Sequence, residues 1–72
     1  MNRTEKLINM NRTEKLINDI VYFRASHDLS QGKFAKLCKV STQTIYSIEN
    51  GLQTPSKMTE AKIRLVIGGG EQ

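Results

Sequence analysis

The chain contains no tryptophan, one cysteine, one histidine and one proline in 72 residues. A single cysteine cannot close a disulfide within the chain, and one cysteine with one histidine cannot form a metal site unless several other residues supply ligands. The sequence also lacks an apolar run near the length of a membrane span, and its N-terminus lacks the apolar block of a signal peptide. We therefore expect a soluble, cytoplasmic protein in a reducing compartment, with no metal and no membrane partner.

Residue patterns that accompany catalysis are also missing. The sequence shows no pair of catalytic acids, no nucleophile beside a base and no metal-binding cluster. Its triple glycine, at residues 68–70, follows the last predicted helix and lacks the strand-to-helix context that a phosphate-binding loop requires. These absences argue against an enzyme, so we assign no catalytic residue, no cofactor and no small-molecule substrate.

The charge of the chain is basic, with a net value of +4, and its length allows one small domain with a thin core. Between residues 31 and 64 the cations outnumber the acids. They are Lys33, Lys36, Lys39, Lys57, Lys62 and Arg64 against Glu49 and Glu60. A basic domain of this size is compatible with nucleic acid, although solvated lysines are common on any protein surface.

The N-terminus carries a duplication, because residues 1–9, MNRTEKLIN, are repeated without change as residues 10–18. A structural repeat would be longer and imperfect, so we interpret the repeat as a duplicated start or an expression feature. Nine residues rotate a helix by about 900°, which would turn Leu7 and Ile8 away from Leu16 and Ile17. We expect Leu16 and Ile17 to join the core and residues 1–9 to be a mobile, dispensable extension or a contact with a partner chain.

Apolar spacing and cap residues predict four helices in residues 10–67, followed by a flexible tail at residues 68–72. The first helix runs from a cap at Thr13 or Asn11 to about Ser26. Its apolar stripe consists of Leu16, Ile17, Ile20, Val21 and Phe23. Two short helices follow at residues 31–38 and 42–50, and the last runs from a cap at Ser56 to about Ile67.

The two short helices are joined by only Lys39, Val40 and Ser41, which allows nothing but a tight corner. Ser30 and Ser41 provide N-terminal caps, and Gly51 provides a residue suited to the left-handed conformation after the second helix. Helices packed at a steep angle through such a turn form a helix-turn-helix. We expect the second helix to expose short, uncharged, hydrogen-bonding side chains, namely Thr42, Gln43, Tyr46 and Ser47.

This stretch resembles the phage repressor and Cro-like (Xre-type) helix-turn-helix family. The resemblance covers residues 20–68 and is carried by Leu29-Ser30-Gln31, Phe34-Ala35, Val40-Ser41, Thr44-Ile45, Ile48-Glu49-Asn50-Gly51 and Pro55-Ser56. It implies an all-α, four-helix, lambda-repressor-like domain, here without the fifth helix that many members have. Two positions depart from the pattern: Cys38 stands for a larger aliphatic residue, and Lys39 stands for glycine. If Lys39 adopts positive φ, the cost relative to glycine is about 1 kcal/mol.

The resemblance also implies roles for individual residues. Base contacts fall to Ser41, Thr42, Gln43 and Ser47. Gln43 is the strongest of them, because an amide can bond adenine through two hydrogen bonds. For phosphate contacts we nominate Ser30, Gln31, Tyr46, Asn50 and Lys57, with Tyr46 alternatively filling a gap beside the preceding helix. An ion pair between Arg24 and Glu49 is implied between the first and third helices.

The predicted function is therefore sequence-specific binding of double-stranded DNA by a nucleoid-associated transcription regulator, a dimeric repressor on a pseudo-palindromic operator. The apolar residues of the last helix cover a wide arc, and part of it should close the core under Ile45 and Ile48. The remainder is either simply exposed or a dimer surface, and we favour the dimer surface. The residues of the arc are Met58, Ala61, Ile63, Leu65, Val66 and Ile67. The alternative is a helix-turn-helix domain that acts as a protein-interaction module on another regulator. Within DNA binding, a phage repressor, a restriction-modification controller and an antitoxin remain equally compatible with the residues.

Overall fold

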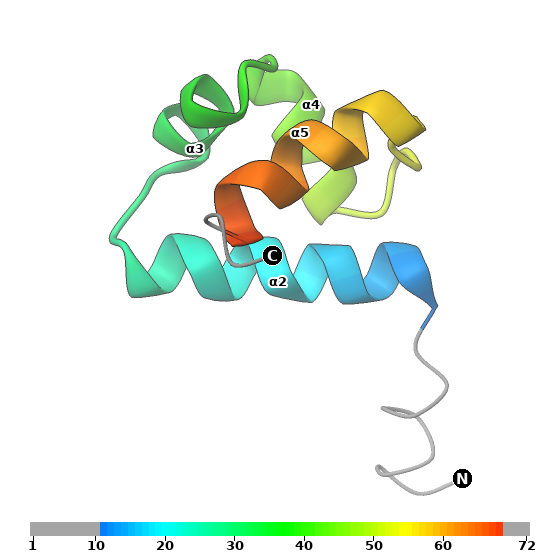
Figure 1. Ribbon diagram of the computed structural model, residues 1–72, viewed down its shortest axis with the longest axis horizontal. Coiled ribbons are helices and arrows are strands. Elements are labelled where there is room, and N and C mark those ends of the chain that lie inside the picture. Colours follow the sequence, from blue (N-terminus) through cyan, green and yellow to red (C-terminus); the bar gives the residue numbers. More distant parts are fainter. Residues whose placement is uncertain (1–10, 69–72) are drawn as a thin grey trace, which may run out of the picture.

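The computed structural model describes residues 11–68, which form four helices and no strand (Figure 1). They are α2 (Arg12–Ser26), α3 (Gln31–Cys38), α4 (Thr42–Glu49) and α5 (Lys57–Gly68). The predicted all-α, four-helix class is confirmed. The expectations for Leu7, Ile8 and the rest of residues 1–9 fall outside the described residues. No helix within residues 11–68 is long and apolar enough to cross a bilayer.

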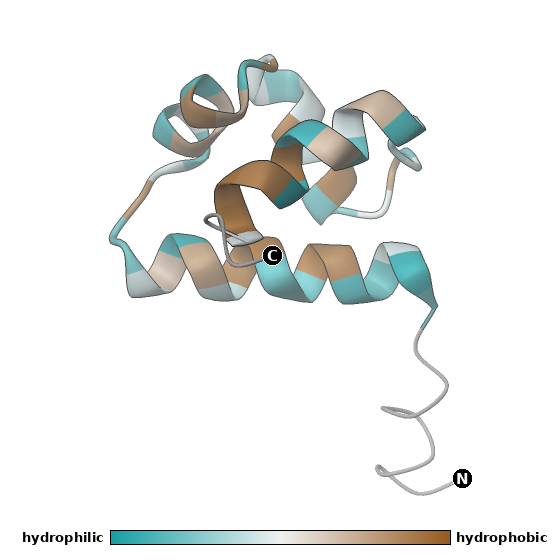
Figure 2. Cartoon of the chain, viewed as in Figure 1, coloured by the Kyte–Doolittle hydropathy of each residue, from teal (hydrophilic) through white to brown (hydrophobic). Residues whose placement is uncertain are grey.

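Helix α2 lies along one side of the molecule, and the three shorter helices are grouped on the other (Figure 1). It packs on α4 and α5, while α3 packs on the same two helices. The core that they enclose is small, and its buried apolar residues are Leu16, Ile20, Phe34, Ala35, Cys38, Ile45, Ile48 and Ile63. Figure 2 shows the hydrophobic second half of α5 next to the middle of α2.

The predicted stripe of α2 needs one correction. Leu16 and Ile20, four residues apart, are fully buried on one face, and Ile17 and Phe23 pack against the edge of the core. Val21 is 47% exposed, and it was wrong to place it in the stripe. One residue beyond Ile20 it lies about 100° further round the helix, on the solvent side.

Each of the first three helices begins at a side-chain cap. Asn11 caps α2 in a reciprocal box with Glu14: Asn11 Oδ1 accepts from the Glu14 N–H at 2.8 Å, and Glu14 Oε1 accepts from the Asn11 N–H at 3.2 Å. This geometry selects Asn11 over Thr13 as the cap. Ser30 and Ser41 cap α3 and α4, accepting from the N–H groups of residues 33 and 44. The caps fix where each helix starts, and hence the length of the turn between α3 and α4.

Helices α2, α3 and α4 are each followed, within two residues, by a residue at positive φ. These residues are Asp28 (54°), Lys39 (60°) and Gly51 (71°). After each, the next residue's N–H bonds a carbonyl five positions back, which is the Schellman arrangement. Gly51 was predicted for this role, and the positive φ considered for Lys39 is confirmed. Asp28 was not foreseen.

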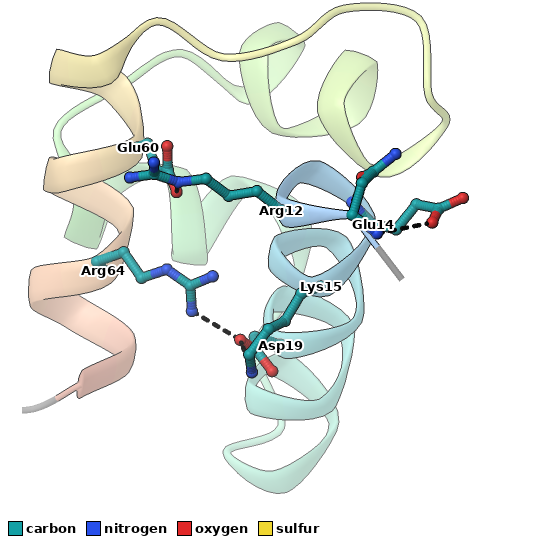
Figure 3. A network of polar contacts seen from close by, with 7 residues as sticks. Arg12, Glu14, Lys15, Asp19, Glu60 and Arg64 are labelled. Atoms are coloured by element: carbon teal, nitrogen blue, oxygen red, sulfur yellow. Dashed lines mark hydrogen bonds and ion pairs between the residues drawn. The ribbon is translucent and has the colours of Figure 1, made fainter. Parts of the chain in front are cut away.

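Helices α2 and α5 are joined by two ion pairs of opposite polarity (Figure 3). Arg12 of α2 donates to Glu60 of α5 at 2.8 Å, and Arg64 of α5 donates to Asp19 of α2 at 2.6 Å. Partial burial acts to raise the pKa of Asp19, but hydrogen bonds and charge from Arg64 and Lys15 outweigh it and leave that pKa below its usual value. The pairs flank the buried contact of Ile63 with the core and favour one register of the last helix on the first.

Candidate nucleic-acid interface

The turn between α3 and α4 sets the position of α4 in the molecule. Lys39 takes the left-handed conformation, which lets the Val40 N–H bond the Ala35 carbonyl at 3.0 Å. Val40 then packs against the core, and the Ser41 hydroxyl accepts the Thr44 N–H at 3.0 Å to start α4. The corner is therefore defined by backbone bonds on both sides, and α4 leaves it in one direction.

The inner face of α4 anchors the helix, and the outer face is open to solvent. Ile45 and Ile48 are fully buried. Thr42, Gln43 and Tyr46 are exposed, Tyr46 to 45%. The predicted outward direction of these three side chains agrees with the structure.

Ser47 differs from the expectation, because it is only 7% exposed and is the one buried polar residue among those the structure describes. Its hydroxyl accepts a hydrogen bond from Gln43 Nε2 at 3.1 Å. The expectation that Ser47 faces water was wrong, because α4 lies closely enough against its neighbours to cover this small side chain. The spacing of four between Gln43 and Ser47 was the signal that could have revealed this bond.

Arg24 and Glu49 hold the C-terminal end of α4 against α2. Arg24 Nη1 donates to both Glu49 carboxylate oxygens, at 2.8 and 2.9 Å, and Arg24 Nε donates to the Leu29 carbonyl at 3.1 Å. Gln31 Nε2 adds a third hydrogen bond to Glu49 at 3.0 Å. With the Glu49 side chain 10% exposed and that of Arg24 23%, the pair is sheltered from water. The participation of Gln31 and of the Leu29 carbonyl was not anticipated from the sequence.

The nominated phosphate-contact residues lie at helix ends. Ser30 precedes α3, and Lys57 is the first residue of α5 and exposed. Asn50 follows α4, and its side-chain N–H bonds the Tyr46 carbonyl at 2.8 Å. Gln31 is half-buried with its amide on Glu49, so a phosphate would have to be met by its second N–H or its backbone.

Charge on this part of the chain is more positive than the sequence count suggests. Glu49 and Glu60 are both paired, with Arg24 and Arg12 of α2. The five lysines between residues 31 and 64 are exposed, and none belongs to an ion pair formed within residues 11–68. These are Lys33, Lys36, Lys39, Lys57 and Lys62. Exposed lysines outside ion pairs, on the two helices that flank α4 in the chain and in the turn before it, suit a polyanion.

The remaining chemistry of this region is structural. Cys38 is 2% exposed, and burial raises the pKa of its thiol to about 11, so it is neutral and unreactive at neutral pH. Within residues 11–68, no three His, Cys, Asp or Glu side chains are grouped as metal ligands would be.

Comparison with known proteins agrees with this geometry. The family model described as "Helix-turn-helix" matches residues 20–64, from the middle of α2 into α5. An uncharacterized HTH-type transcriptional regulator of Methanocaldococcus jannaschii is 43% identical over 51 residues, which cover 71% of this chain and 77% of the relative. No solved structure matches the chain.

Proposed function

The chain belongs to the phage repressor and Cro-like helix-turn-helix family, and from this premise we propose that it is a transcription regulator that binds double-stranded DNA in a sequence-specific manner. Helix α4 is the element that enters the major groove, which is wide enough for one helix and presents a different pattern of donors and acceptors for each base pair.

One observation carries the proposal: α4 is divided into a fully buried apolar face and an exposed, uncharged polar face. Ile45 and Ile48 fix the helix to the core, and the Arg24–Glu49 pair fixes its end. Gln43 and Thr42 are left facing outward near its N-terminus, where helices of this kind contact base edges.

Base recognition is assigned to Gln43, with Thr42 and Ser41 beside it. Gln43 can bond adenine with one donor and one acceptor, and the Thr42 methyl can contact the methyl group of a thymine. Buried Ser47 is not proposed as a direct base contact.

Phosphate contacts are assigned to the ends of the neighbouring helices. Ser30 and Gln31 at the start of α3, Asn50 after α4 and Lys57 at the start of α5 would set the register of α4 along the groove. Tyr46 is exposed on α4 and would contact the sugar-phosphate backbone at the groove edge.

Dimerisation is assigned to an exposed stripe on α5 formed by Met58, Ala61 and Leu65. Met58 is 70% exposed and Leu65 75%, and the spacing puts all three on one face. Two copies packed antiparallel about Ala61 would each set Met58 against the partner's Leu65, which makes the stripe self-complementary as a two-fold interface requires. Leu65→Glu should give monomers by sedimentation, whereas Tyr22→Glu, at an equally exposed site on α2, should not.

Selection of bound sequences from a random DNA pool tests the proposed function. We expect a pseudo-palindrome with half-sites about one helical turn apart. Gln43→Ala should lose about 1–3 kcal/mol of discrimination at particular base pairs. Lys57→Ala should weaken all sequences alike and reduce the dependence of affinity on salt. A pool from which no sequence is enriched would overturn the proposal.

A second candidate is a protein-interaction module that acts on another regulator through the same α5 stripe, whose exposed Met58 and Leu65 favour it. In that case the stripe would bind a different protein, the DNA pool would yield no sequence, and the isolated chain would sediment as a monomer.

A further inference from the structure

We propose that Ser47 orients the amide of Gln43 and thereby makes α4 select adenine over guanine. The inference rests on the proposed function, because it concerns how the same helix would discriminate bases. Ser47 would not touch DNA. It would act through Gln43, so it is a positioning residue.

The first support is the placement of the two side chains. They lie four residues apart on α4, one turn above the other, with Ser47 7% exposed and Gln43 exposed. Gln43 Nε2 donates to Ser47 Oγ at 3.1 Å. Among residues 11–68, Gln43 is the one partner that the structure gives to the Ser47 hydroxyl.

The second support is the hydrogen-bonding capacity that remains. A glutamine amide has two N–H donors and one carbonyl acceptor. With one N–H on Ser47, the other N–H and Oε1 are free and their order in space is fixed. Adenine presents one acceptor, N7, and one donor, the N6 amino group, and matches that pair. Guanine presents two acceptors, O6 and N7, so Oε1 would meet an acceptor and repel it.

The third support is entropic. An exposed glutamine has several free side-chain rotations, and ordering them on binding opposes complex formation. The bond to a buried hydroxyl orders the amide before DNA arrives. Removing that bond lets the amide rotate and donate to guanine. Discrimination should therefore fall, while affinity for random DNA, set by phosphate contacts, should not.

The test compares the full-length wild type with Ser47→Ala, which removes the hydroxyl and keeps a good helix former. The control is Ser26→Ala, because Ser26 also bonds within its own helix, to the Tyr22 carbonyl at 2.8 Å, but lies on α2. The base pair contacted by Gln43 is the one at which Gln43→Ala loses discrimination, and two versions of the operator carry adenine or guanine there. The ratio of affinities for these two operators should be about three- to tenfold lower in Ser47→Ala than in wild type. Ser26→Ala should leave it unchanged. Ser47→Thr, which retains the hydroxyl, should keep most of the preference, and Ser47→Ala in the Gln43→Ala background should have no further effect.

Three results would overturn the inference: an unchanged preference in Ser47→Ala, a loss at a different base pair, which would indicate direct contact by Ser47, or a wild-type preference for guanine. A further measurement needs no DNA and separates this inference from the proposed function. Nitrogen relaxation of the Gln43 side-chain amide in the free protein should show an ordered group in wild type and a mobile one in Ser47→Ala. Equal mobility in both would refute the inference even if the operator were found. An ordered amide in a protein that selects no DNA would refute the proposed function, and base selection with it, but would leave the ordering of Gln43 by Ser47 standing.

Discussion

Replacing Lys39 by glycine should stabilise the protein, because Lys39 occupies the left-handed conformation at the corner between α3 and α4 with φ of 60°. A side chain with a Cβ is strained there by roughly 1–2 kcal/mol, whereas glycine is not. Glycine also loses more backbone entropy on folding, which offsets part of the gain. The expected net effect is an increase of about 1 kcal/mol in the free energy of unfolding, or about 4–8 °C in melting temperature for a domain of this size.

Two control variants separate backbone conformation from other consequences of removing a lysine. Lys39→Ala removes the charge and the long side chain but keeps the Cβ, so it should give none of the gain. Lys36→Gly places the same glycine inside α3, at an exposed helical position, and should cost about 1 kcal/mol.

Thermal and urea unfolding followed by circular dichroism measures all three variants. The explanation fails if Lys39→Gly is no more stable than wild type, or if Lys39→Ala gains as much as Lys39→Gly. In the latter case the benefit would come from lost charge repulsion among the lysines rather than from relief of backbone strain.

Three further outcomes follow from the contacts described. Arg24→Ala should lower the free energy of unfolding by about 2–3 kcal/mol, because the sheltered Glu49 carboxylate keeps only Gln31 as a side-chain donor. A double-mutant cycle with Glu49→Gln should show strong coupling, and additive effects of the two substitutions would contradict the ion pair. The pKa of Asp19 is lowered in the folded state, so its contribution to stability is present above the unfolded pKa and is lost as pH falls through the folded pKa. The free energy of unfolding of Asp19→Asn should therefore depend less on pH below about pH 4 than that of wild type, and an unchanged pH profile would refute this. Cys38, whose pKa is raised to about 11 by burial, should react with a thiol reagent at pH 8 only as fast as the chain opens, and immediate labelling of the native protein would contradict its place in the core.

Helix positions and caps could be predicted because they depend on local signals. Ser30 and Ser41 lie immediately before apolar spacing of helical period, and the alternation of polar and apolar residues along residues 42–49 assigns Ile45 and Ile48 to the core. The pairing of Arg24 with Glu49 connects residues 25 positions apart, and only the family resemblance could indicate it.

Other features depend on tertiary geometry that the sequence pattern does not contain. Ser47 is small and polar, and its burial follows from how closely α4 lies against its neighbours. Asp28 at positive φ follows from where α2 has to end so that Leu29 can reach the core, and aspartate gives only a weak signal for that conformation. The cross-links Arg12–Glu60 and Asp19–Arg64 join residues more than forty positions apart, and no single position among them is unusual.

Because those two cross-links have opposite polarity, the charges of α2 are complementary to those of α5 in one relative position of the two helices. Sliding either helix by a turn, or grafting α5 from a relative without its α2 counterpart, would bring cations beside cations or leave them without counter-charges. The outward residues of α4 carry no such dependence, apart from the Gln43–Ser47 bond. An engineer who wanted a new DNA target could therefore change the exposed positions 42, 43 and 46 within the existing frame, whereas a chimera divided between α4 and α5 should express poorly.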